Sequence, residues 1–146
     1  MAADFAYRLE TRRIKEEDFP YNGQTFTTPA AVVSFMAALE NSDIEKMVIL
    51  HLNTKSFLNC LQPFYGTVDR AVIWPREILK HAILSQSTCL ILIHNHPSGN
   101  PEPSQEDKAL TKTIKDAAAL FDVRILDHII LGENGKYFSF QESNLL

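Results

Sequence analysis

Cysteine is scarce in this chain, whose 146 residues include only Cys60 and Cys89. Two thiols cannot form the disulfide framework that stabilises many small secreted domains. Both lie in apolar stretches, which is typical of small side chains in a hydrophobic core. We therefore interpret the chain as a cytoplasmic protein that keeps its thiols reduced.

Long apolar runs are missing as well. No stretch approaches the roughly 18 apolar residues of a membrane-spanning helix, and Met1 to Phe5 lack the basic and apolar segments of a signal peptide. We expect no membrane partner. The 45% of apolar residues is enough for one sizeable core. We expect a single domain over residues 1–146, with its core at about residues 25–142 and an edge strand and loop at residues 1–24.

The chain also has no surplus of basic residues, since its formal net charge is −4. Nucleic-acid binding without sequence preference needs cations clustered against phosphates. The densest basic patch, Arg12-Arg13-Ile14-Lys15, is followed at once by Glu16-Glu17-Asp18. The sequence therefore disfavours nucleic acid as a partner.

Apolar patterning predicts strands that alternate with helices. Helices are expected to begin at Pro29, at Pro75 and just after Ser104, because proline at the first helical position and serine at the N-cap are common helix starts. A turn at residues 132–135 predicts a hairpin between the last two strands. Strands are predicted at residues 5–14, 47–52, 57–61, 71–74, 88–93, 123–131 and 137–140.

The most informative stretch runs from His94 to Asp107. His94 and His96 follow a buried strand, and alternate residues of a strand share a face, so both imidazoles can point the same way. Asp107 falls in the first turn of the next helix, after a loop rich in proline and glycine. A strand end and a helix start can thus hold three ligands around one ion.

Zinc suits this set of ligands best. Two imidazoles and one carboxylate fill three tetrahedral positions and leave the fourth for water, as in catalytic zinc sites. Manganese, iron and nickel accept the same ligands. Ordinary explanations compete with a metal, because Ser104 and Asp107 also form a capping-box pattern and the loop residues also suit a simple turn.

The same residues resemble the H-x-H-P-x-G-x-P-x-P-S-x-x-D core of the JAMM metalloprotease family. More narrowly, they resemble its bacterial RadC branch, long labelled as DNA-repair proteins. The likeness covers about residues 25–142 in matching order. It extends through four further segments: Leu52-Asn53-Thr54-Lys55, Gly66-Thr67, Pro75-Arg76-Glu77 and Leu126-Asp127-His128-Ile129-Ile130.

The resemblance implies an α/β fold, with a mixed β-sheet between helices in a three-layer sandwich like that of cytidine deaminases. It implies that His94, His96 and Asp107 bind one Zn²⁺ and that Ser104 stabilises the oxyanion formed on the attacked carbonyl. The implied reaction is hydrolysis of a peptide or isopeptide bond in a protein or peptide substrate. Longer relatives carry an N-terminal helix-hairpin-helix region, and we expect this chain to be a short form without it.

One position departs from the family pattern. The family's general-base glutamate is expected shortly before the Gly-Thr pair, where this chain has Leu61 and Gln62. Leucine cannot transfer a proton, and the Gln62 amide can orient a water in the site but cannot act as a base at neutral pH. Glu77 matches a different glutamate of the branch. Three interpretations follow, in this order: a zinc metallopeptidase, a non-catalytic zinc-containing module that binds a protein tail, and a DNA-repair accessory.

Three further predictions concern residues outside the ligand motif. Asp127 and His128 face opposite sides of their strand, so at most one of them faces the metal, either bonding to a ligand imidazole or simply packing. Trp74 is expected to anchor the core. His51 and His81 are expected to be ordinary histidines outside the site.

Overall fold

The apolar segments predicted as strands form one five-stranded sheet in a computed structural model. The structure describes residues 19–64 and 73–146, together with residues 8, 10, 12, 14, 15 and 17. Three predicted features lie wholly or partly outside these residues: the strands at residues 5–14 and 71–74, and the Gly66-Thr67 pair.

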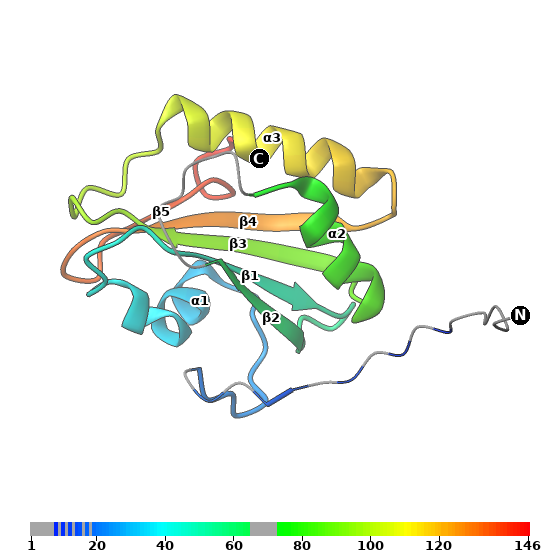
Figure 1. Ribbon diagram of the computed structural model, residues 1–146. Helices are drawn as coiled ribbons and strands as arrows, with labels where there is room; N and C mark the ends of the chain where they lie inside the picture. Colours follow the sequence, from blue (N-terminus) through cyan, green and yellow to red (C-terminus); the bar gives the residue numbers. More distant parts are fainter. Residues whose placement is uncertain are drawn as a thin grey trace, which may run out of the picture.

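The sheet has the strand order β2-β1-β3-β4-β5 (Figure 1). Only β3 and β4 pair in parallel, and the other neighbours are antiparallel. The predicted α/β fold with a mixed sheet is therefore confirmed. The strands are β1 (Met47–Leu52), β2 (Leu58–Phe64), β3 (Cys89–Asn95), β4 (Arg124–Leu131) and β5 (Tyr137–Ser139).

Helices cover both faces of the sheet and complete three layers (Figure 1). Helix α1 (Pro29–Phe35) and the short 3₁₀ helix η1 (Ala37–Leu39) lie on one face, whereas α2 (Pro75–Leu84) and α3 (Gln105–Ala119) lie on the other. None of the helices in the described ranges is long and apolar enough to cross a membrane.

Strands β1 and β3 are buried along their whole length because they run through the middle of the sheet. Their side chains alternate between two cores. Val48 and Leu50 pack on the α1 side, and Met47 and Ile49 pack on the side of α2 and α3. Burial of each of these large apolar side chains contributes about 1.5–3 kcal/mol.

The helix starts follow the sequence signals. The Thr28 hydroxyl accepts a hydrogen bond from Ala31 N at the start of α1, and Ser104 caps α3. Proline is the first residue of both α1 and α2. The prediction that Trp74 anchors the core is wrong, because it is 60% exposed. Its extended backbone, just before Pro75, leaves the ring outside the helix–sheet interface.

Strand direction determines what meets at the edge of the sheet. Helix α3 connects β3 to its parallel neighbour β4, so α3 begins beside the end of β3. Strand β1 is antiparallel to β3, with Met47 opposite His94, so the start of β1 lies at the same edge. Three chain segments that are far apart in the sequence therefore converge there.

Candidate metal centre

Two imidazoles and a carboxylate meet at this edge. His94 is fully buried at the end of β3, and its Nε2 lies 3.0 Å from the Nε2 of His96. Asp107, in the first turn of α3, places Oδ1 3.4 Å from His94 Nε2 and Oδ2 3.5 Å from His96 Nε2. The structure thus brings together the three residues that the sequence predicts as ligands.

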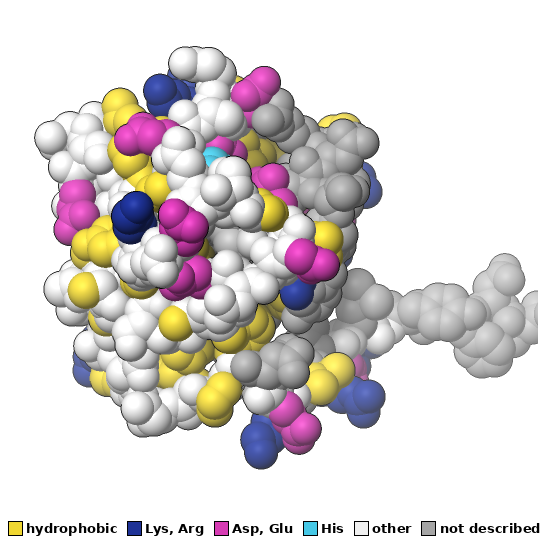
Figure 2. All heavy atoms as spheres, turned by 90° about the vertical axis from the view of Figure 1, so that its left-hand side faces the viewer, with side chains coloured by type: hydrophobic (Ala, Val, Ile, Leu, Met, Phe, Trp, Pro, Cys, Tyr) yellow, Lys and Arg dark blue, Asp and Glu magenta, His cyan; other side chains and the backbone are white. Residues whose placement is uncertain are grey.

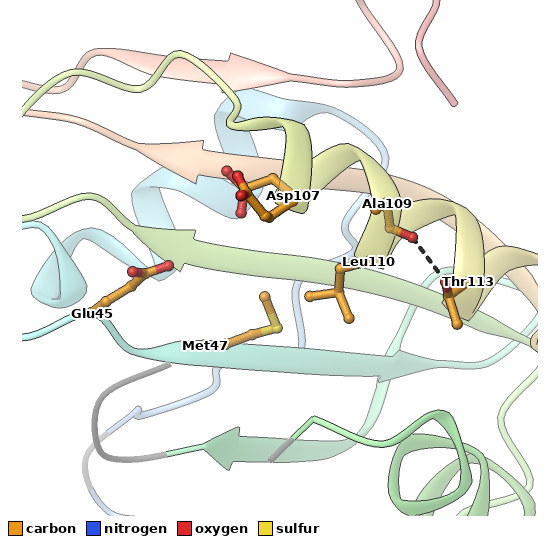
Figure 3. Close-up of a pocket in the computed structure, with 7 residues that line it drawn as sticks. Glu45, Met47, Asp107, Ala109, Leu110 and Thr113 are labelled. Atoms are coloured by element: carbon orange, nitrogen blue, oxygen red, sulfur yellow. Dashed lines mark hydrogen bonds between the residues drawn. The ribbon is translucent and has the colours of Figure 1, made fainter. Parts of the chain in front are cut away.

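A second carboxylate joins them from the segment before β1. Glu45 Oε1 lies 3.7 Å from His94 Nε2, and one ligand atom from each of the four residues lies within 4.8 Å of the other three. Figure 3 shows the Glu45 carboxylate on the chain just before β1 and the Asp107 carboxylate at the start of α3. From the side that is on the left of Figure 1, a histidine side chain is visible at the surface close to acidic side chains (Figure 2).

The spacing of these atoms suits a small divalent cation. Ligand atoms about 2.0–2.2 Å from a tetrahedrally coordinated zinc ion lie roughly 3.3–3.6 Å from one another. The distances of 3.4 and 3.5 Å between the Asp107 oxygens and the two imidazole nitrogens fall in that range, and the separation of 3.0 Å between the imidazoles lies just below it.

A chain of hydrogen bonds defines the tautomer of His94. The Thr111 hydroxyl donates to the backbone carbonyl of Asp107 at 2.6 Å, so it accepts from His128 Nδ1, also at 2.6 Å. The other nitrogen of His128, Nε2, then accepts from His94 Nδ1 at 2.8 Å. His94 therefore presents an unprotonated Nε2 to the cluster.

A single hydrogen bond defines the tautomer of His96. Its Nδ1 donates to the backbone carbonyl of Asn100 at 2.8 Å, which leaves the Nε2 lone pair of the neutral ring facing His94. Two lone pairs 3.0 Å apart repel each other unless they share a cation or a proton. The donor set, with its hydrogen-bonded outer nitrogens, could hold a metal ion.

Electrostatics favours the charge states that a metal requires at His94 and Asp107. Burial lowers the pKa of His94 to about 4, so this imidazole is neutral at pH 7. Burial also lowers the pKa of His128. The Asp107 carboxyl is desolvated, which by itself raises its pKa, but hydrogen bonds from His96 and Ser104 hold the pKa well below its usual range. Asp107 in turn raises the pKa of His96, because the protonated form of His96 donates a hydrogen bond to this carboxylate.

Ser104 acts on the ligand carboxylate and on the helix at once. Its hydroxyl donates to Asp107 Oδ2 at 2.6 Å and accepts from Asp107 N at 3.0 Å. The Ser104 backbone N–H donates to the same Oδ2 at 2.7 Å, which completes a capping box. The capping pattern and the ligand pattern therefore coexist. In this arrangement the one hydroxyl hydrogen orients Asp107.

The two candidates for outer contacts point in opposite directions, as strand alternation requires. His128 faces the cluster and bonds to His94. Asp127 faces away, where Oδ2 accepts from Ser139 Oγ at 2.6 Å and Oδ1 accepts from the backbone N–H of Gln141 at 3.0 Å. Asp127 therefore ties β4 to the chain after β5 and does not reach the ligands.

Comparison with known proteins identifies the family. A model of the RadC-like JAB domain matches residues 26–145. The chain belongs to the RadC-like JAB domain family. The family resemblance that the sequence motifs predict is thereby confirmed.

Curated relatives of the RadC-like JAB domain carry the uninformative name UPF0758 protein. One from Coxiella burnetii is 43% identical over 136 residues, which cover 92% of this chain and 60% of the relative. One from Pasteurella multocida is 47% identical over 111 residues, which cover 75% of this chain and 49% of the relative. The chain thus spans about half to three-fifths of the length of these relatives.

Neither residue at the position that sequence analysis assigned to the general base reaches the four-residue cluster. Leu61 packs on the α1 side of the sheet. Gln62 bonds to His51 Nε2 through its oxygen, at 3.0 Å, and donates to the Glu77 carbonyl at 3.2 Å. It lies on β2, two strands away from β3. The carboxylate that lies beside the histidines together with Asp107 belongs to Glu45, which sequence analysis did not identify.

The residues around Glu45 in the sequence do not indicate that it lies beside the histidines. It lies in a polar segment before β1, where an acidic residue is unremarkable. Its proximity to His94 depends on the antiparallel pairing of β1 with β3, which places Met47 opposite His94. A search for acidic residues immediately before a buried strand that neighbours the ligand strand would have found it.

A close contact between two loops supports the position of His96. A Cβ atom added at Gly132 would lie 2.5 Å from the Gly99 carbonyl oxygen, so only glycine fits there. Glu133 N donates to that carbonyl at 3.0 Å. This contact fixes the loop whose Asn100 carbonyl orients the His96 ring.

Proposed function

We propose that this chain is a zinc-dependent hydrolase that cleaves a peptide or isopeptide bond in a protein or peptide substrate. His94, His96 and Asp107 would hold the ion. The observation that supports this proposal most strongly is the Glu45 carboxylate 3.7 Å from His94 Nε2, because hydrolysis needs a base beside the ligands. Membership of the RadC-like JAB domain family is consistent with it.

A zinc ion bound there supplies Lewis-acid polarisation of the substrate carbonyl and acidifies the attacking water. Glu45 takes the proton from that water as its oxygen bonds to the carbonyl carbon. The carbon–nitrogen bond then breaks, and Glu45 delivers the proton to the departing amine. The Glu45 side chain is one-third exposed, so it can meet both water and substrate.

The remaining residues hold this geometry in place. Ser104 orients Asp107 through two hydrogen bonds. Its hydroxyl can donate to a developing oxyanion only after it leaves Asp107 Oδ2. His128 and Thr111 keep the Nδ1 proton of His94 away from the cluster.

The decisive test separates metal binding from hydrolysis. Zinc content is measured by mass spectrometry for the wild-type chain, Glu45→Gln and His94→Ala, and cleavage is followed with a mixture of fluorescence-quenched peptides. We expect zinc in the first two proteins and not in His94→Ala. We expect Glu45→Gln to cleave about 100 to 10,000 times more slowly than the wild type.

The outcomes also distinguish the alternative of a non-catalytic zinc module. That alternative depended on a missing base, and Glu45 removes its main support. A wild-type chain that holds zinc and binds peptides without cleaving any would favour it again. Unchanged cleavage in Glu45→Gln would refute the assigned role of Glu45, and a wild-type chain without zinc affinity would refute the proposal as a whole.

A further inference from the structure

The segment that carries Glu45 has no regular secondary structure of its own. It follows η1 and runs through residues 42–46 to Met47, the first residue of β1. Figure 3 shows Glu45 on this segment, just before the strand. An irregular backbone is held firmly only where other groups bind its peptide units. The groups that bind this segment therefore determine where the Glu45 carboxylate lies.

The side chain of Asn95 binds the backbone of this segment at three points. Its Nδ2 donates to the carbonyl of Ser42 at 3.3 Å and to the carbonyl of Ile44 at 3.1 Å. Its Oδ1 accepts from the Lys46 N–H at 2.8 Å. The Asn95 backbone N–H also donates to the Lys46 carbonyl at 3.4 Å. The two peptide groups that flank Glu45 are thus both bound to the same side chain.

The burial of Asn95 makes these hydrogen bonds effective in holding the segment. The residue is 1% exposed, so water does not compete for its amide. A primary amide offers two N–H groups and one oxygen, and both ends of this amide are bonded to the segment. Without the amide, two carbonyls and one N–H group lose a partner, and the segment must move towards water to replace it.

Strand alternation sends Asn95 and the neighbouring histidines to opposite faces of the sheet. His94 points to the side of α3, where Asp107 lies. Asn95 follows it in β3 and points to the side of α1, together with Ile93. Asn95 therefore holds the backbone from one face while the Glu45 carboxylate reaches His94 Nε2 on the other, at 3.7 Å. One short stretch of β3 positions both a predicted ligand and the acid.

We propose that Asn95 is a positioning residue that holds the Glu45 carboxylate beside the histidines. The placement of Glu45 is a property of the chain itself, whereas its consequence for cleavage rests on the proposed hydrolase function. Asn95 acts through Glu45 and takes no part in proton transfer. A displacement of about 1 Å at a reacting group can slow a reaction about 100-fold, so we expect loss of the amide to slow cleavage by about this factor.

Two variants of Asn95 and the same two changes at Asn59 form the test set. Asn95→Leu keeps nearly the shape of the side chain and removes the amide. Asn95→Ser leaves space for a water that can bond the freed backbone groups, so the chain should fold. Asn59 is a matched control, because its amide also donates to a backbone carbonyl, that of Ser85 at 3.1 Å. This contact lies before the first residue of β3, at the end of the strand away from His94.

The position of Glu45 is measured first by NMR in the metal-free chain, where no reaction is needed. Nuclear Overhauser effects between the Glu45 methylene protons and the His94 ring report their proximity, and hydrogen exchange reports the bonding of the Lys46 N–H. We expect both Asn95 variants to lose the Overhauser effect and to exchange the Lys46 hydrogen about tenfold faster or more. The Asn59 variants should match the wild type in both measurements.

The effect on cleavage is measured in the zinc-loaded chain by a double-mutant cycle with Glu45→Gln. Asn95→Ser alone should lower kcat about 100-fold, with KM and zinc content nearly unchanged. In the Glu45→Gln background the same change should lower kcat by less than about threefold, because the residue that Asn95 positions is no longer a base. Asn59→Ser should leave kcat within about threefold of the wild type in both backgrounds.

An unchanged Overhauser effect in both Asn95 variants, or an equal loss in the Asn59 variants, would overturn the positioning role. So would additive losses in the cycle with Glu45→Gln. Unfolding of both Asn95 variants would mean that this residue supports the whole fold, which also overturns the proposal. If the Overhauser effect is lost as expected and even the wild type cleaves no peptide, the positioning of Glu45 stands and the hydrolase function fails.

Discussion

Two histidines lie fully buried on the same face of the sheet, and their surroundings differ. His94 ends β3, whereas His51 lies near the end of β1, and burial lowers the pKa of each to about 4. His94 faces His96, Asp107 and Glu45. His51 donates from Nε2 to Gln62, and its Nδ1 has no hydrogen-bond partner among the described residues.

The difference shows what burial does and what it does not do. Burial makes both imidazoles neutral at pH 7, which a metal ligand requires. Only the carboxylates around His94 add the negative charge that favours a divalent cation. His51 has a histidine as its ring neighbour, His81 at 6.1 Å between centroids, and gains no acid there. Sequence analysis correctly expected that His51 lies outside the cluster.

The largest expected effect is on metal affinity. His94→Ala removes a ligand and should weaken zinc binding by more than about 100-fold, beyond the range typical of an outer contact. His51→Gln should change zinc binding little, although its histidine is as deeply buried. Competition with a chelating dye measures both affinities. Similar losses in the two variants would show that the clusters are not separate.

The second-largest expected effect is on the pH dependence of stability, and it comes from the buried imidazole of His51. Its pKa is about 4 in the folded chain and about 6.5 unfolded. The unfolded chain therefore binds more protons between these values, and stability falls as pH falls from 6.5 to 4. The difference of about 2.5 pKa units corresponds to roughly 3 kcal/mol of unfolding free energy.

Urea unfolding of the metal-free wild type and His51→Gln measures this contribution. The other titrating groups are the same in both chains and cancel in the comparison. We expect the pH dependence of the variant to be shallower across this window. Parallel curves would mean that His51 titrates normally in the folded chain.

The third effect comes from the hydrogen bonds behind His94. Thr111→Val keeps the shape of the side chain and removes the hydroxyl that holds the His128 proton at Nδ1. Changes to such outer contacts usually cost about 10- to 100-fold in metal affinity. Nitrogen NMR of the imidazoles should also show His94 losing its fixed tautomer. Thr113→Val is a matched control, because the Thr113 hydroxyl donates to Ala109 O within its own helix and does not contact His128.

The smallest effect lies on the opposite face of the sheet. Thr28→Ala removes the hydroxyl that caps α1 and should lower the unfolding free energy by about 1 kcal/mol. Zinc affinity should not change, because α1 packs on the side away from the ligands. Denaturation and dye competition on one sample check both statements. A weaker metal site would show coupling across the sheet.

The elements were largely predictable from the sequence, because their signals are local. The apolar run at residues 47–52 is β1 as predicted, and β3 and β4 begin one residue later than predicted. Proline marks the first residue of α1 and of α2. The grouping of His94, His96 and Asp107 was also predictable, since a short loop joins their elements.

The contacts that were missed are long-range. Glu45 reaches the cluster through strand pairing, and Thr111 reaches it through the facing of α3 and β4. Neither contact can be predicted from the residues that neighbour Glu45 or Thr111 in the sequence. Trp74 was misjudged for a related reason, because its exposure depends on how α2 meets the sheet and not on the hydrophobicity of the ring.

The pairing of β1 with β3 has a consequence for synthesis of the chain. The acid, the imidazoles and the ligand aspartate come from three segments, and translation completes them in the order Glu45, His94, Asp107. A nascent chain that exposes only β1 carries an isolated glutamate with no hydrolytic power. If the chain is a hydrolase, as proposed, it therefore cannot cleave a peptide bond until β1 and β3 have paired and brought the three segments together.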